Sequence, residues 1–190
     1  MASQKALTAA STSPVTLLKA LLVLILSLPA AISQTSSAEA VASLQSRFDR
    51  DRAGLEKLLG NIPNSPQQLG DGSIVSALTS LQSELDSLNK QIGGARSIVD
   101  GKMKSVQSNQ GLSATDKSTL LAELNRQLAP LNELGRSISS LREKIDSLVS
   151  DQIPKWDQSY KSYADIMGME AAREKLRKSI REFTSAALGK

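Results

Sequence analysis

Apolar side chains recur at intervals of three and four residues along most of the chain after residue 39, with polar and charged side chains between them. This spacing places the apolar residues on one face of an α-helix. Between residues 73 and 108 they follow a seven-residue repeat, formed by Leu78, Leu81, Leu85, Leu88, Ile92, Ala95, Val99 and Val106. The pattern predicts a long helix over 73–108 with an apolar seam of the coiled-coil type.

Three further segments show the helical spacing. In residues 39–59 the periodic positions are Val41, Leu44, Phe48, Leu55 and Leu58. In the segment that begins near residue 113, which Pro154 is expected to end, they are Leu120, Leu124, Leu128, Leu131, Leu134, Ile138, Leu141, Ile145 and Leu148. In the last segment they are Trp156, Tyr160, Tyr163, Met167, Leu176, Ile180, Phe183 and Ala187. The three segments after residue 72 each span more than 30 residues, so each predicts a helix about 50 Å long.

Clusters of Gly, Pro and Asn mark the breaks between these helices. Residues 60–72, with the sequence GNIPNSPQQLGDG, predict a loop. Gly111 is suited to a left-handed helix cap, and Ser113 with Asp116 resembles a capping box that opens the next helix. The short turn between them predicts antiparallel neighbours. We therefore predict an all-α fold, an elongated antiparallel up-and-down bundle or coiled coil of three long helices and one shorter helix.

Two helix-weakening elements are expected at the same level of this bundle. Gly93 and Gly94 precede Gly111 by 17 to 18 residues, and Pro130 follows it by 19. Proline lacks the backbone donor of a helix interior, and paired glycines lower the cost of bending. Gly93, Gly94 and Pro130 therefore form a candidate hinge, and the alternative is that each break accommodates close packing.

Composition excludes several kinds of chemistry. The chain has no cysteine and no histidine, so it cannot form disulfides, thiolate nucleophiles, imidazole bases or His-ligated metal sites. Residues 49–54 resemble the start of a calcium loop, but Ala53 and Gly60 stand where the fifth and twelfth positions need oxygen ligands. We predict no catalytic, metal-binding or cofactor-binding residue and no cofactor.

The N-terminus has the layout of a secretory signal peptide. An acid-free segment with Lys5 and Lys19 precedes the apolar run 20–28, which is followed by Pro29 and small residues. Cleavage after Ser33 or after Ala40 fits the small side chains there. An uncleaved membrane anchor through residues 15–32 and an organelle transit peptide are the alternatives. The expected division is 1–40 as signal peptide or anchor and 41–190 as a helical domain that is secreted or periplasmic.

The net charge of the chain adds little to the prediction of its partners. The formal net charge is +4, and without Lys5 and Lys19 the remainder holds 21 basic against 19 acidic side chains. Nucleic acid is therefore not an expected partner, and a membrane is one only if the N-terminal segment is retained. Near the C-terminus four cations alternate with acids: Arg173, Arg177, Lys178 and Arg181. They predict either contact with an anionic surface or a solvated face with pairs such as Glu174 and Lys178.

Three of the five aromatic side chains fall within eight positions, at Trp156, Tyr160 and Tyr163. Their spacing of four and three places them on one helical stripe. The stripe is expected either to cover one end of the core beneath the 60–72 loop or to form an exposed contact with a partner.

These features predict an exported, non-enzymatic helical protein with a structural or protein-interaction role. Its expected partners are another protein or further copies of itself, because a seam of Leu and Ile can be shared between chains. The alternative is an extracytoplasmic chaperone, or a protein that binds lipids or other apolar ligands, which opens at the Gly93, Gly94 and Pro130 level.

Overall fold

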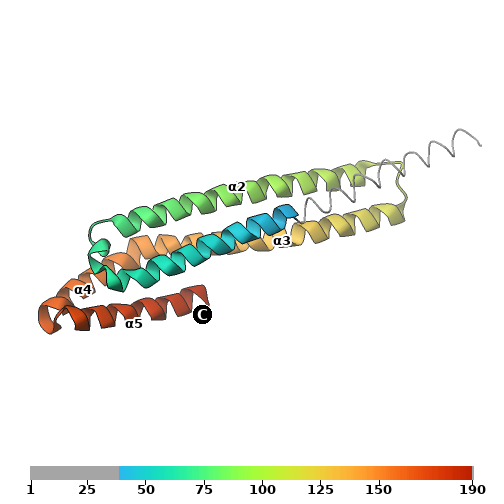
Figure 1. Cartoon of the computed structure of the whole chain (residues 1–190). Helices are drawn as coiled ribbons and strands as arrows, with labels where there is room; N and C mark the ends of the chain where they lie inside the picture. Colours follow the sequence, from blue (N-terminus) through green and yellow to red (C-terminus); the bar gives the residue numbers. More distant parts are fainter. Residues whose placement is uncertain (1–38, 190) are drawn as a thin grey trace, which may run out of the picture. The chain divides into compact units, whose positions relative to one another are not determined.

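A computed structural model describes residues 39–189 of the chain (Figure 1). The chain divides after Ala40 into two units, and the expected signal peptide lies almost wholly outside the described residues. Residues 39–189 contain helices and no strand, so the all-α class is confirmed. The elongated up-and-down bundle stays a prediction.

The described helices follow one another with short connections. Residues 39–61 form the first helix, called helix 39–61 below. The 3-10 helices η1 (Ile62–Asn64) and η2 (Pro66–Leu69) follow, then α2 (Ser73–Ser108) and α3 (Ala114–Ser147). A π-helical turn, η3 (Leu148–Gln152), leads into α4 (Ile153–Met167), and α5 (Met169–Leu188) ends the described chain.

Helices α2 and α3 pack against each other as an antiparallel pair, joined by residues 109–113. The predicted N-cap at Ser113 is confirmed, while the Asp116 carboxylate bonds to the Ser113 hydroxyl and not to its backbone N–H. The Ser113 hydroxyl accepts a hydrogen bond from the Asp116 backbone N–H at 3.1 Å and donates one to the Asp116 carboxylate at 2.6 Å. The predicted left-handed cap at Gly111 is wrong. Instead, the Asn109 side-chain oxygen accepts from the Gly111 N–H at 2.8 Å, a local turn in which Gly111 keeps a negative φ.

The chain does not reverse at Pro154, contrary to expectation. Helical structure continues from α3 through η3 into α4, and Pro154 lies in the first turn of α4. The π-helical turn shifts the hydrogen-bond register just before Pro154, so its missing N–H and its ring are accommodated. The reversal occurs at Gly168, whose φ of 87° and ψ of 159° suit glycine alone. Helices α4 and α5 then pack against each other.

The segment 60–72 is more ordered than the predicted loop. Helix 39–61 extends into it, and η1 and η2 follow. Both 3-10 helices have proline in their first turn and bury apolar side chains, namely Ile62, Pro63, Pro66 and Leu69. η2 contacts α2 and α4, and η1 contacts α5. This segment therefore forms part of the core boundary.

One apolar core joins helix 39–61, α2, α3, α4 and α5. Its completely enclosed members include Leu59, Ile62, Leu78, Leu85, Leu88, Ile92, Ile145 and Leu148. No polar or charged residue is buried among residues 39–189. Helix 39–61 and α5 lie alongside the half of the α2–α3 pair that is nearer η1 and η2 (Figure 1).

Candidate interaction surfaces

The aromatic stripe runs from the core to the surface. Trp156 is 5% exposed, and its ring meets Phe183 of α5 edge to face at a centroid distance of 5.8 Å. Tyr160 is half-buried against the same core. Tyr163 is half-buried near the surface, where the Lys175 ammonium lies 4.1 Å from its ring centroid. Trp156 therefore holds α4 on α5, and the role of the stripe in partner contact stays a prediction.

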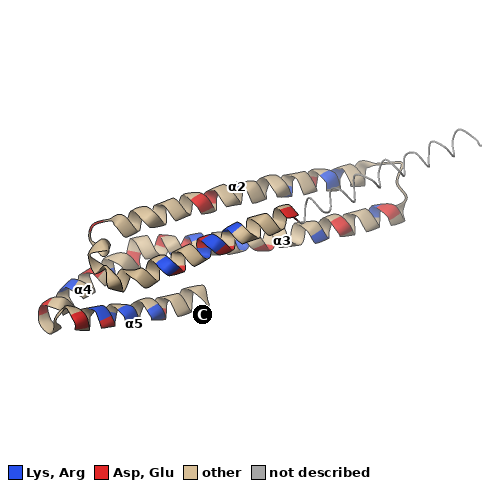
Figure 2. Cartoon of the chain, viewed as in Figure 1, with Lys and Arg blue, Asp and Glu red and all other residues tan. Residues whose placement is uncertain are grey.

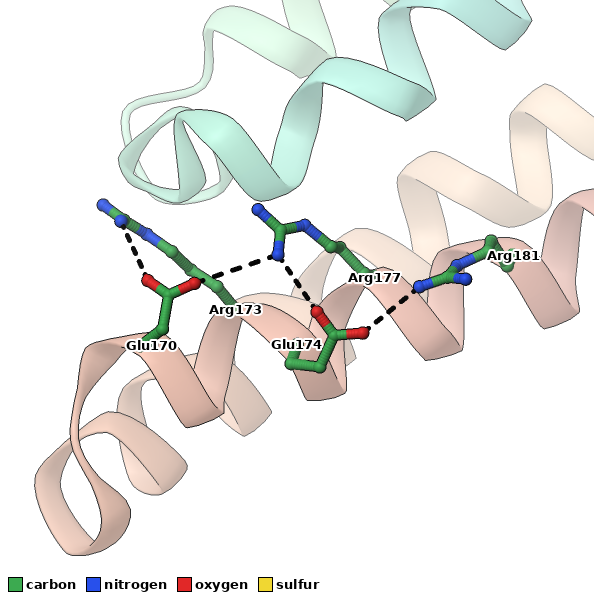
Figure 3. Close-up of polar contacts among 5 residues, drawn as sticks. All are labelled: Glu170, Arg173, Glu174, Arg177 and Arg181. Atoms are coloured by element: carbon green, nitrogen blue, oxygen red, sulfur yellow. Dashed lines mark hydrogen bonds and ion pairs between the residues drawn. The ribbon is translucent and has the colours of Figure 1, made fainter.

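Three of the four predicted anionic-surface cations are held by glutamates on their own helix (Figure 3). Glu170 pairs with Arg173 at 3.5 Å and with Arg177 at 3.9 Å. Glu174 pairs with Arg177 at 3.0 Å and with Arg181 at 3.3 Å. The expected pair of Glu174 with Lys178 is not formed. Arg177 and Arg181 instead pair with the two carboxylate oxygens of Glu174.

The Arg173 and Arg177 guanidinium groups point from α5 toward the turn at the end of helix 39–61 (Figure 3). η1, which follows that helix directly, contacts α5. The last carbonyls of a helix carry partial negative charge, so cations are stabilised there. Contact of the row with an anionic surface stays a prediction.

Lys178 makes no ion pair within residues 39–189, and it lines an open groove beside Tyr163 on the outer face of α5. The groove has a volume of about 840 Å³, and its lining holds both cations and acids: Glu174, Lys175, Lys178, Arg181 and Glu182. Figure 2 shows the same mixture of both charges along helix 39–61 and α5. Mixed charge gives this groove no preference for one sign of ligand.

The turn between α4 and α5 is the most apolar exposed feature of the described chain. Ile166 is 78% exposed, Met167 59% and Met169 65%. Only Ile98, on α2, joins them as an exposed large hydrophobic residue within 39–189. Met167 was expected on the helical seam, and it lies outside the core because Gly168 reverses the chain next to it.

The candidate hinge lies in uninterrupted helix. α2 continues through Gly93 and Gly94, and α3 continues through Pro130. A Cβ built on either glycine meets no atom within 4 Å, so close packing does not explain them. Hinge motion at Gly93, Gly94 and Pro130 stays a prediction.

Close packing at this level instead involves Arg96 and Gly135, which the sequence analysis did not single out. The Arg96 guanidinium donates a hydrogen bond to the Leu131 carbonyl at 2.9 Å. A Cβ on buried Gly135 would lie 2.4 Å from Arg96 Nη2. The signal in the sequence was a glycine inside an unbroken helical pattern, which often marks close approach.

Two carboxyl groups of the described part have altered acidity. Partial burial, then a hydrogen bond and charge repulsion from Glu84 on α2, raise the pKa of Asp51 on helix 39–61. Asp71 accepts a hydrogen bond from the Ser73 N–H at 2.9 Å at the start of α2. This backbone bond, together with the Ser73 side chain, lowers the pKa of Asp71.

No group of three or more acidic side chains within residues 39–189 is arranged to hold a metal ion. In the same range, no helix has the length and hydropathy needed to cross a bilayer. Comparison with known protein families, with curated proteins and with solved structures finds no match to this chain.

Proposed function

We propose that this chain is an exported, non-enzymatic helical protein that acts by binding another protein. The observation that carries this proposal is the apolar turn, defined here as Ile166, Met167, Gly168 and Met169. It gathers three of the four exposed large hydrophobic residues of the described chain at one reversal. Exposed apolar clusters of this kind are typical of interaction sites, since isolated apolar residues on a surface are common but grouped ones are not.

The apolar turn joins two helices that pack against each other. Trp156 and Phe183 join α4 to α5, and Leu176 and Ile180 bury the same face of α5. Gly168 makes the reversal in a backbone conformation that is open to glycine. Methionine adapts its flexible side chain to the shape of a partner.

Charges beside the apolar turn indicate the chemistry of the partner. Asp165 is exposed and forms no ion pair within the described part of the chain, and the Glu170 side chain is 76% exposed. Glu170 already pairs with Arg173 and Arg177, so Asp165 carries the unpaired charge beside the turn. These acids disfavour an anionic bilayer surface. They favour a protein groove with an apolar floor and a cationic rim.

Site-specific photo-crosslinking tests the proposal. A photoreactive amino acid in place of Met167 is expected to give a discrete adduct in cells that express the full chain. The same amino acid in place of Ile98, the exposed hydrophobic residue on α2, is the matched control and is expected not to give that adduct. The adduct mass distinguishes a second copy from another protein.

A second crosslinking experiment removes the apolar surface. The adduct should disappear when Ile166 and Met169 are both changed to Ser in the crosslinking variant. Equal labelling from positions 98 and 167, or labelling at 167 that the Ser substitutions leave unchanged, would contradict a site at the apolar turn.

The alternative function is an extracytoplasmic chaperone or a binder of lipids and other apolar ligands that opens at the Gly93, Gly94 and Pro130 level. It is supported by the open space around both glycines, because two residues that weaken a helix have no packing reason to be there. Hydrogen exchange is the test: this function requires faster exchange of the amides near Gly93 than of the amides near Leu85.

Export is part of both proposals and depends on residues that lie outside 39–189. N-terminal sequencing of the mature protein from its native source is the direct test. A mature chain that begins at Gln34 or Val41 is the expected result, and an intact Met1 in the cytosol would contradict export.

A further inference from the structure

A second cavity lies where three helices meet near the end of α5. Its volume is about 510 Å³, within the range of small-molecule sites, which is roughly 300–1,000 Å³. Helix 39–61, α3 and α5 all contribute to its lining: Phe48, Arg52, Arg136, Ser137, Ser140, Leu141, Lys144, Ala186, Ala187, Leu188 and Gly189. The cavity is separate from the groove beside Tyr163.

The charged side chains that line this cavity are all cationic. Arg52, Arg136 and Lys144 are cations, Ser137 and Ser140 are hydroxyl donors, and no acid lines the cavity. The Tyr163 groove differs, because Glu174 and Glu182 lie among its cations. Three cations around one space raise its positive potential, which attracts an anion.

The cations of this cavity differ in how far they are already engaged. Arg52 lies 3.7 Å from Glu56 and donates a hydrogen bond to the Leu188 carbonyl. The side chains of Arg136 and Lys144 form no ion pair and no hydrogen bond within residues 39–189. The Ser137 and Ser140 hydroxyls also form none there. The side chains of Arg136 and Lys144 can therefore bind a ligand, whereas the Arg52 side chain is already held by Glu56 and the Leu188 carbonyl.

Helical spacing explains why these groups share one space. Arg136, Ser140 and Lys144 follow each other at intervals of four along α3, so they lie on one face. The α2-facing side of α3 uses other residues, among them Arg142, which pairs with Asp86 at 2.8 Å. The face toward helix 39–61 and α5 is thus the one left with unpaired cations.

Apolar side chains form the rest of the lining. Phe48 and Leu141 belong to the core and are 6% and 4% exposed, and Ala187 packs against the same core. A guanidinium matches the planar oxygens of a carboxylate or a phosphate, and an ammonium adds a point charge. An apolar group attached to that anion would contact the exposed edges of Phe48 and Leu141 together with Ala186 and Ala187.

We propose that this cavity binds an amphipathic anion, with a carboxylate or phosphate head held by Arg136, Lys144 and the two serines and a short acyl chain on Phe48, Leu141 and Ala187. This site is independent of the apolar turn and of the Gly93 level. Its success or failure therefore does not decide the proposed function.

Isothermal titration of the full chain with decanoate, below its micellar concentration, tests the proposal. Hexanoate, inorganic phosphate and decanol serve as comparison ligands. Each buried methylene tightens binding about fourfold, so decanoate should bind clearly more tightly than hexanoate. Decanol, which lacks the charge, should bind at least about tenfold more weakly, since a hydrogen bond to a charged group contributes that much or more.

Two pairs of substitutions separate this site from general charge. The variant Arg136→Gln with Lys144→Gln should lose about tenfold or more of the decanoate affinity. Lys102→Gln with Lys155→Gln removes the same charge from exposed lysines outside the cavity and should leave the affinity unchanged. Circular dichroism confirms that both variants stay helical.

Three results would overturn the proposal. The first is that the Arg136 and Lys144 variant keeps the wild-type decanoate affinity. The second is that both double variants weaken binding equally, since total charge would then explain the effect. The third is that inorganic phosphate binds as tightly as decanoate, in which case the ligand is a free anion and the apolar lining plays no part.

Discussion

The guanidinium of Arg96 on α2 covers Gly135 on α3 and donates a 2.9 Å hydrogen bond to the carbonyl of Leu131, one turn earlier in α3. A side chain at position 135 would occupy the space of this guanidinium, because a Cβ there lies 2.4 Å from Arg96 Nη2. Arg96 and Gly135 therefore form a matched pair across the two longest helices.

A double-mutant cycle measures this pair. In an Arg96→Ala background, Gly135→Ala should stabilise the protein by about 0.5–1 kcal/mol, because alanine favours helix and its methyl group fits the vacated space. With Arg96 present the same change should lose this gain, since the methyl group displaces the guanidinium. Urea unfolding should give a coupling energy of about 1 kcal/mol or more, and additive effects would show that the pair is not coupled.

Gly168 should be the least replaceable glycine of the described chain. Its φ of 87° and ψ of 159° strain any residue with a side chain, so Gly168→Ala is expected to cost about 1–3 kcal/mol. Gly101→Ala is the matched control, because Gly101 lies inside α2 with open space around its Cβ position. Thermal unfolding should show a lower Tm for the first variant and an unchanged or higher Tm for the second.

Gly93 and Gly94 offer a gain in stability. Both lie in a helix interior and neither is required by packing, so each change to Ala should stabilise the fold by about 0.5–1 kcal/mol. Under the alternative function, the doubly substituted protein should also lose ligand uptake while its stability rises. A double variant that is less stable than wild type would contradict this account of the glycines.

Trp156→Ala should cost about 3–5 kcal/mol in free energy of unfolding, because it empties a buried site against Phe183. Tyr163→Ala on the same stripe is the control. It should cost within about 1 kcal/mol, chiefly through the lost contact with the Lys175 ammonium. Equal costs in urea denaturation would show that the stripe does not pass from core to surface.

Asp51 should make the stability of the folded protein depend on pH. Its pKa is raised from the ordinary value of 3.8, so the folded state holds this proton more tightly than the unfolded chain does. The stabilisation from this group is fully present below pH 3.8 and is lost as the pH rises through the raised pKa.

Replacing Asp51 by Asn isolates this effect. Asp51→Asn removes the charge that Glu84 and burial disfavour, so it should raise Tm at pH 7, and the difference from wild type should shrink as the pH falls to about 3. Asp49→Asn, two residues away, is the control for loss of a carboxylate. A Tm difference for Asp51→Asn that stays constant between pH 3 and 7 would contradict the raised pKa.

The sequence by itself determined the helical class and most of the core, but the single long helix expected after Pro154 is divided at Gly168 into α4 and α5. The seven-residue repeat placed α2 at 73–108, and five of its seam positions are buried: Leu78, Leu85, Leu88, Ile92 and Val99. The N-cap at Ser113 was also predictable, because its two partners lie three residues apart. These features depend on side-chain periodicity and on contacts within one turn, both of which are local.

The tertiary structure decided where the chain turns and which charges meet. Pro154 and Gly168 are both able to end a helix, and the chain reverses at Gly168. A reversal at this position allows Trp156 of α4 and Phe183 of α5 to meet in the core. The cavity of Arg136 and Lys144 and the pair of Arg96 with Gly135 join residues from different helices. Proline and glycine permit more than one local conformation, so the burial of apolar side chains across separate helices selects among them.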